Sequence, residues 1–82
     1  MLNILIIDDE APARNRLRRM LVKMPTVQVA GEAATASAAL EFIESLAPDV
    51  LLLDISMPGM DGMALAKLLK QQPASPAVIF CT

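Results

Sequence analysis

Short, nearly continuous apolar runs alternate along this chain with segments of helical periodicity. Residues 2–7 (LNILII), 50–53 (VLLL) and 77–81 (AVIFC) are the apolar runs, and residues 26–31 (TVQVAG) alternate between apolar and polar side chains. Runs of this kind predict strands, and strands without a polar face are typical of parallel sheets buried on both sides. Because three helical segments separate the four strands, we expect an α/β protein with a doubly wound parallel sheet.

Capping residues and prolines set the limits of the three expected helices. The first should begin at the acidic residues 8–10 and the second at Thr35 or Ser37, while Asp61 should cap the third. Each helix should end before the next proline along the chain. Their inward-facing residues are expected to be Ala13, Leu17, Met20, Leu21 and Met24 on the first helix, Ala39, Leu40, Ile43 and Leu46 on the second, and Leu65, Leu68 and Leu69 on the third.

Composition indicates one small folded domain over residues 1–82, because 55% of the residues are hydrophobic and only 20% are charged. No apolar run approaches the roughly 20 residues that a membrane-spanning helix needs. Acidic residues 8–10 lie where a signal peptide would have its apolar segment. We therefore expect a cytoplasmic protein that does not contact a membrane.

Missing residue types exclude several kinds of site. The chain has no histidine, so it cannot supply an imidazole base or a phosphohistidine, and its single cysteine excludes an internal disulfide. The three glycines match no nucleotide-binding loop. A net charge of -2 and the absence of Tyr and Trp argue against nucleic-acid binding by this segment. The polar chemistry that remains is mostly that of carboxylates.

Three carboxylates are expected to meet at one edge of the sheet. Asp8 and Asp9 follow the 2–7 strand, and Asp54 follows the 50–53 strand. Ligands of doubly wound sheets bind beyond the carboxyl ends of the strands, so neighbouring strands would bring these residues into one cleft. Two unit charges about 4 Å apart repel by about 4 kcal/mol at an effective dielectric of about 20, and a divalent cation relieves that repulsion. Mg²⁺ fits, because it prefers oxygen ligands and is commonly held by carboxylates together with phosphate oxygens.

A carboxylate beside Mg²⁺ can also accept a phosphoryl group. It is already ionised, so the attack needs no general base, and an aspartyl phosphate results. The lack of histidine is therefore compatible with a phosphoacceptor.

The acidic pair in IIDDE, the segment LLLDISMPGMDG around Asp54 and a last strand that ends at Thr82 together resemble the receiver domain of two-component response regulators. The resemblance is collinear over the whole chain, and the segment around Asp54 is its most specific part. The opening IIDDEAPARNRLRRML also resembles receivers joined to LytTR-type DNA-binding domains. The family implies a flavodoxin-like sheet of order 2-1-3-4-5, of which this chain would form 2-1-3-4.

The resemblance implies roles for individual residues. Asp54 would be the phosphoacceptor, Asp8 and Asp9 would bind Mg²⁺ together with Asp54, Ser56 would offer its backbone carbonyl to the metal, and Thr82 would supply the switch hydroxyl. The implied donor is a sensor histidine kinase or a phosphotransfer protein. Phosphorylation would control an attached output domain that we expect to bind DNA. The receiver itself would not be an enzyme, beyond self-catalysed phosphoryl transfer.

The chain departs from the family pattern at its end. Full receivers continue through a fourth helix, a fifth strand followed by a lysine that contacts the phosphoryl group, and a fifth helix, so residues 1–82 would be a partial receiver domain. We therefore expect Mg²⁺ binding with slow or unproductive phosphorylation. The unprotected edge of the 77–81 strand could pair two copies into a homodimer. The alternative function is a pseudo-receiver or dimerising interaction module without phosphoryl transfer.

Simpler interpretations exist for some of these residues. Asp8 or Asp9 could be an N-cap, since aspartate is a preferred capping residue. Asp54 is harder to explain in this way, because a carboxylate at the end of an apolar strand is costly to bury without a partner. Basic residues on the first helix could form a solvated face or a docking surface for a kinase or phosphotransfer domain. They are Arg14, Arg16, Arg18, Arg19 and Lys23.

Overall fold

The computed structural model describes residues 1–54, 65, 67, 69–71 and 76–81. Its elements are β1 (Leu2–Ile7), α1 (Ala11–Val22), β2 (Val27–Ala33), α2 (Ala36–Leu46), β3 (Val50–Asp54) and β4 (Ala77–Cys81). Residues 65, 67, 69 and 70 are helical, and Leu65 and Leu69 are buried as predicted for the third helix. Leu68 and the expected cap of that helix, Asp61, lie outside the described residues.

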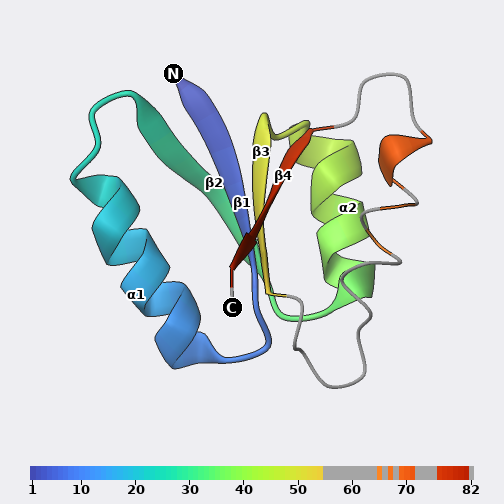
Figure 1. Ribbon diagram of the computed structural model, residues 1–82, viewed down its shortest axis with the longest axis horizontal. Helices are drawn as coiled ribbons and strands as arrows, with labels where there is room; N and C mark the ends of the chain where they lie inside the picture. The colour runs from blue at the N-terminus through green and yellow to red at the C-terminus, as the bar shows by residue number, and fades with distance from the viewer. Residues whose placement is uncertain (55–64, 66, 68, 72–75, 82) are drawn as a thin grey trace.

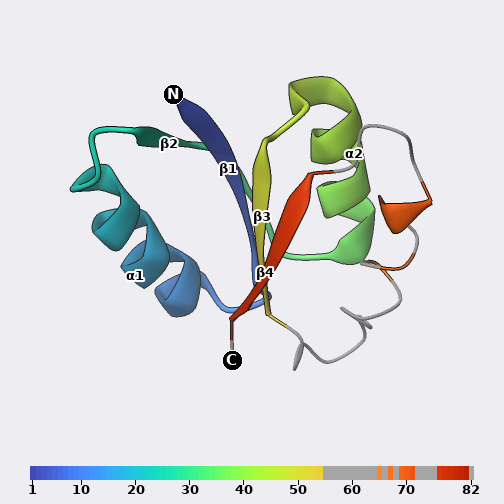
Figure 2. The same cartoon turned by 45° about the horizontal axis from the view of Figure 1, so that its top comes forward.

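The described strands form one parallel sheet in the order β2-β1-β3-β4. Figures 1 and 2 show α1 and α2 on opposite faces of this sheet, and both helices contact β1 and β2. The chain therefore changes from one face to the other at β2, which lies between α1 and α2 in the sequence. This arrangement confirms the doubly wound α/β fold and the predicted order 2-1-3-4.

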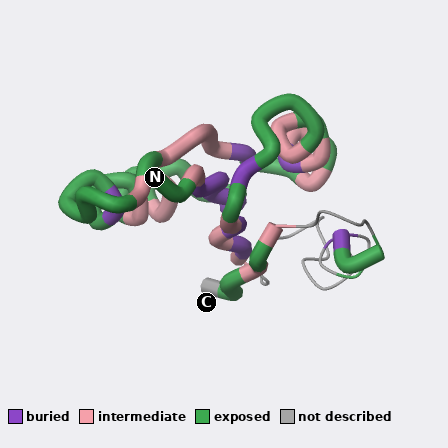
Figure 3. Tube along the Cα trace, turned by 90° about the horizontal axis from the view of Figure 1, so that it is seen from above, coloured by how far each residue is buried: buried purple, intermediate pink, exposed green. Residues whose placement is uncertain are grey.

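β1 runs through the middle of the core, which explains why its sequence has no polar face. Ile4 and Ile6 pack with Leu21 of α1, whereas Leu5 and Ile7 belong to a larger cluster on the α2 side. Figure 3 shows buried positions along the middle of the sheet, between the more exposed helices. The buried members of the larger cluster are Leu5, Ile7, Ala33, Ala39, Leu51, Leu53, Leu65 and Leu69.

The apolar stripe of α1 is narrower than predicted. Leu17 and Leu21 pack against the sheet, but Met20 is 59% exposed and Met24 is 48% exposed. Met20 lies about 100° around the helix from Leu21, so it points away from the strands that α1 covers. Met24 follows the end of the helix at Val22 and lies in the turn before β2. The prediction that both methionines face the core is therefore wrong.

β2 ends two residues later than the predicted 26–31 strand. Glu32 and Ala33 continue the strand because they pair with Ile6 and Ile7 of β1, after a shift in register earlier in the ladder. The extension brings Glu32 and Ala33 to the edge of the sheet at which β1 ends.

β4 lies at the edge of the described sheet and pairs there with β3. Its residues Ile79 and Phe80 are 51% and 41% exposed. An exposed apolar edge strand can pair with another chain, but the homodimer through β4 stays a prediction. Within the described part of the chain, no helix is long and apolar enough to cross a membrane.

Thr35 is the N-cap of α2, and its Oγ1 accepts a hydrogen bond from the Ala38 N–H at 3.1 Å. We expect Thr35→Ala to lower the free energy of unfolding by about 1 kcal/mol, because a first-turn N–H loses its acceptor. Ser37→Ala is the matched control, because Ser37 lies inside the helix. Urea titrations followed by circular dichroism measure both effects, and equal losses would contradict the assignment of Thr35 as the cap.

Candidate functional site

The carboxyl ends of β1 and β3 lie at the same edge of the sheet, because the two strands are parallel neighbours. Ile7 of β1 pairs with Leu53 of β3. Asp8 and Asp54 are the next residues along the chain, so both come directly after this pair. One oxygen from each carboxylate of Asp8, Asp9 and Asp54 lies within 4.8 Å of the other two. The carboxylates that were expected to converge therefore do so, and we call this cluster the acidic site.

The three carboxylates of the acidic site differ in burial. Asp8 is 7% exposed, Asp54 is half-buried and Asp9 is exposed. The Asp8 Oδ1 accepts a hydrogen bond from the Glu10 backbone N–H at 2.9 Å, and the Asp8 backbone N–H donates to the Ala33 carbonyl at 3.0 Å. Asp8 is thus fixed on one side by the loop that leads to α1 and on the other by the extended end of β2.

The structure at the start of α1 shows whether Asp8 or Asp9 acts as the N-cap of this helix. The N-cap is Glu10, whose side chain makes no capping hydrogen bond, and Pro12 lies in the first turn. Asp8 accepts its hydrogen bond from Glu10, which precedes the helix, rather than from a first-turn N–H. The interpretation of Asp8 or Asp9 as the N-cap is therefore wrong, and their position at the sheet edge needs another explanation.

Electrostatics supplies that explanation. Because these oxygens lie within 4.8 Å of one another, two ionised carboxylates repel by at least about 3 kcal/mol at an effective dielectric of about 20, and by less at Asp9, whose exposure lets water screen its charge. A cation bound among them would offset this repulsion. The donor atoms are carboxylate oxygens from two adjacent strand ends, and such a donor set fits Mg²⁺. The acidic site is therefore suited to hold a divalent cation next to a carboxylate that can act as a nucleophile.

Ser56 and Thr82 lie outside the described residues. Their predicted roles, the metal-binding carbonyl of Ser56 and the switch hydroxyl of Thr82, stay predictions. β4 ends at Cys81, whose backbone is in register with Asp54.

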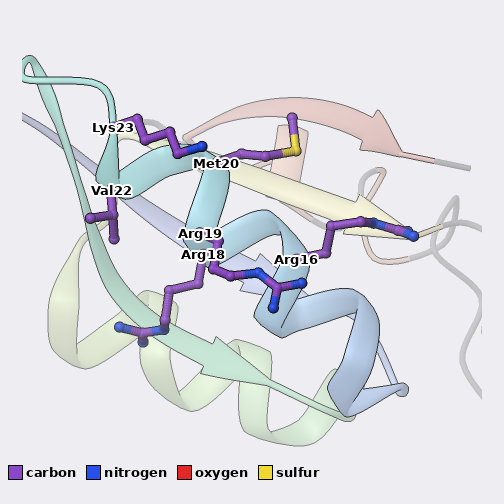
Figure 4. Close-up of a pocket in the computed structure, with 6 residues that line it drawn as sticks. All are labelled: Arg16, Arg18, Arg19, Met20, Val22 and Lys23. Atoms are coloured by element: carbon purple, nitrogen blue, oxygen red, sulfur yellow. The ribbon is translucent and has the colours of Figure 1, made fainter.

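Basic side chains on α1 fall into two groups. Arg14 and Arg18 pair with Glu32 of β2, with Nε to Oε distances of 3.4 Å and 2.7 Å. The remaining basic residues are exposed. Exposed residues of α1 and its C-cap line a surface hollow of about 490 Å³ (Figure 4). The two interpretations of the basic residues, a solvated face and a docking surface, both stay predictions. The residues that line the hollow are Arg16, Arg18, Arg19, Met20, Val22 and Lys23.

Sequence reasoning missed the role of Glu32 as the common partner of Arg14 and Arg18. The two arginines are four residues apart, which places them on one face of a helix. That spacing could have indicated a shared acidic partner. It could not have identified Glu32, because the predicted strand stopped at Gly31.

Comparison with known proteins assigns this arrangement to a family. A family model described as the response regulator receiver domain matches residues 4–82. The positive alginate biosynthesis regulatory protein of Pseudomonas aeruginosa is 48% identical over 82 residues, which cover 99% of this chain and 33% of that protein. The sensory transduction protein LytT of Bacillus cereus is 37% identical over 82 residues, which cover 100% of this chain and 33% of that protein.

A solved structure has the same fold. The crystal structure of the response regulator domain of Thermotoga maritima CheB superposes with a TM-score of 0.87 at 31% identity, and the match covers 98% of this chain and 59% of that one. The chain thus spans about a third of the two curated relatives.

Proposed function

The chain belongs to the response regulator receiver domain family, and we propose that it accepts a phosphoryl group on Asp54 from a sensor histidine kinase or a phosphotransfer protein. Receiver domains act with histidine kinases in two-component signalling. The observation that carries the proposal is the acidic site: Asp54 ends β3 with a carboxylate oxygen within 4.8 Å of those of Asp8 and Asp9. This cluster combines a nucleophile with ligands for the cation that phosphoryl transfer requires.

The residues that would hold Mg²⁺ are Asp8, Asp9 and Asp54 through their carboxylates, and Ser56 through its backbone carbonyl. When bound, Mg²⁺ would neutralise negative charge on the oxygens of the transferred phosphoryl group. Because Asp8 is buried and hydrogen-bonded to Glu10, it provides a fixed ligand on which the more exposed Asp9 and Asp54 can converge.

Asp54 is the nucleophile in this proposal. An oxygen of its ionised carboxylate forms a bond to phosphorus while the bond between phosphorus and the donor's imidazole nitrogen breaks. The imidazole keeps the electron pair of that bond and takes up a proton from water. The donor histidine must come from another protein, because this chain contains none. The product is an aspartyl phosphate. The domain itself is therefore modified, whereas an enzyme would be regenerated unchanged after the reaction.

Intact-mass spectrometry after incubation with acetyl phosphate tests the proposal. We expect the chain to gain the mass of one phosphoryl group slowly in Mg²⁺ and to remain unmodified in EDTA. The requirement for a cation follows from the charge of the acidic site, which otherwise repels an anionic donor. Mg²⁺ binding without any modification would contradict phosphoacceptor function and favour the alternative, an interaction module without phosphoryl transfer.

We extend the proposal to the parent protein. In this proposal, an attached output domain binds DNA and responds to phosphorylation of Asp54. The relatives of the protein include a biosynthesis regulator and a sensory transduction protein, and this chain covers 33% of each. Thr82 would transmit the change through its hydroxyl. Signalling of this kind between a sensor kinase and DNA would take place in the cytoplasm.

A further inference from the structure

Arg14 connects the first turns of α1 to the acidic site. Its Nη1 donates a hydrogen bond to the backbone carbonyl of Asp8 at 2.8 Å, and its side chain is only 20% exposed. The bond goes to the carbonyl rather than to the carboxylate, so it does not occupy a carboxylate oxygen of the acidic site. That carbonyl belongs to the planar peptide between Asp8 and Asp9. Arg14 therefore restrains the peptide plane that joins two residues of the acidic site.

Glu32 forms an ion pair with the guanidinium of Arg14. Its Oε1 lies 3.4 Å from the Arg14 Nε, and its Oε2 accepts a hydrogen bond of 2.7 Å from the Arg18 Nε. Glu32 is 23% exposed in its side chain and lies next to Ala33, whose carbonyl accepts from the Asp8 N–H. The main chain of Asp8 is thus held at its N–H by β2 and at its carbonyl by Arg14.

We propose that Arg14, anchored by Glu32, is a positioning residue that holds the peptide between Asp8 and Asp9 so that their carboxylates converge on Asp54. The inference rests on the proposed Mg²⁺ site. Without this restraint, repulsion among the carboxylates would favour loop conformations in which Asp9 moves away from the other two. Loss of a hydrogen-bonding partner that orients a metal ligand typically weakens metal binding by about 10–100-fold.

Positioning and simple electrostatics predict opposite signs. Arg14→Gln removes a positive charge near an acidic site, so through-space electrostatics alone would make cation binding tighter. If Arg14 positions the ligands, the same substitution weakens binding. The matched control is Arg19→Gln, which removes a charge from an exposed position in the last turn of α1.

Mg²⁺ titration by two-dimensional NMR is the appropriate measurement, because the chain has no Trp or Tyr to report binding by fluorescence. We expect Arg14→Gln to raise the Mg²⁺ Kd about 10-fold, Arg14→Lys to restore part of the affinity, and Arg19→Gln to leave the Kd unchanged. In EDTA, the amide of Asp9 should exchange faster with solvent in Arg14→Gln than in the wild type, because the restraint on its peptide is lost.

An unchanged or lower Kd in a folded Arg14→Gln variant would overturn the inference. If that variant fails to fold, Arg14→Lys decides, because lysine keeps the positive charge: electrostatics alone predicts an unchanged Kd, whereas loss of positioning predicts a higher one. Failure of the wild-type chain to bind Mg²⁺ would instead contradict the proposed function. In that case, unchanged exchange of the Asp9 amide in the variants would overturn the positioning role separately.

Discussion

Replacing Asp54 with asparagine should abolish Mg²⁺-dependent incorporation of phosphate from acetyl phosphate, with the initial rate falling by at least about 100-fold, since loss of a nucleophile removes the reaction rather than slowing one step. Asparagine keeps the shape of the side chain but has a neutral amide in place of the attacking carboxylate. Intact-mass spectrometry and peptide mapping measure the modified fraction and its position. Modification that persists at Asp8 or Asp9 would show that the acceptor has been assigned to the wrong carboxylate.

Asp49→Asn is the matched control for this substitution. Asp49 immediately precedes β3, at the opposite end of the strand from Asp54, and its Oδ2 accepts a hydrogen bond from the Asn3 backbone N–H at 2.8 Å. An asparagine can still accept that bond through its side-chain oxygen. We therefore expect Asp49→Asn to be phosphorylated like the wild type. A loss in both variants would indicate a general effect of removing a negative charge rather than loss of the acceptor.

Sequence predicts the acidic site well because two simple rules coincide there. β1 and β3 are apolar except for Asn3 and the terminal Asp54, which indicates a parallel sheet, and polar residues at the carboxyl ends of such strands collect at one edge. The pairing of Ile7 with Leu53 then brings Asp8 and Asp54 together. Only the neighbouring position of β1 and β3 had to be assumed, and the right-handed crossovers of such folds leave few other arrangements.

The contacts that support the site were not predictable in the same way. Glu32 looked like the start of a loop, because hydrophobic alternation ends before it, yet pairing with β1 extends the strand through Ala33. Met20 has the apolar character and spacing of a core residue, but the contact of α1 with the sheet is made through Leu17 and Leu21, and Met20 stays exposed. Both errors arise because tertiary pairing, and not local pattern, decides where a strand ends and how wide a helix interface is.

The largest loss of stability should come from Leu53→Ala. Leu53 is fully buried in the cluster on the α2 side and directly precedes Asp54. Removal of three side-chain carbons leaves a cavity, and buried Leu→Ala substitutions cost about 2–5 kcal/mol. Domains of this length have total stabilities of about 4–12 kcal/mol at typical values per residue, so we expect a large part of the stability to be lost. Urea titration in EDTA measures the change.

Leu2→Ala is the matched control, because Leu2 begins β1 and is 48% exposed. We expect it to cost less than about 1 kcal/mol, as for substitutions away from the core.

Mg²⁺ provides a second comparison. A ligand that binds only the folded state, at about 100 times its Kd, adds about 2.7 kcal/mol to the free energy of unfolding. That increment should appear in Leu2→Ala and shrink in Asp54→Asn, which lacks one ligand. Similar losses in Leu53→Ala and Leu2→Ala would contradict the central place of β3 in the core, whereas an equal Mg²⁺ increment in Asp54→Asn would show that the cation binds elsewhere.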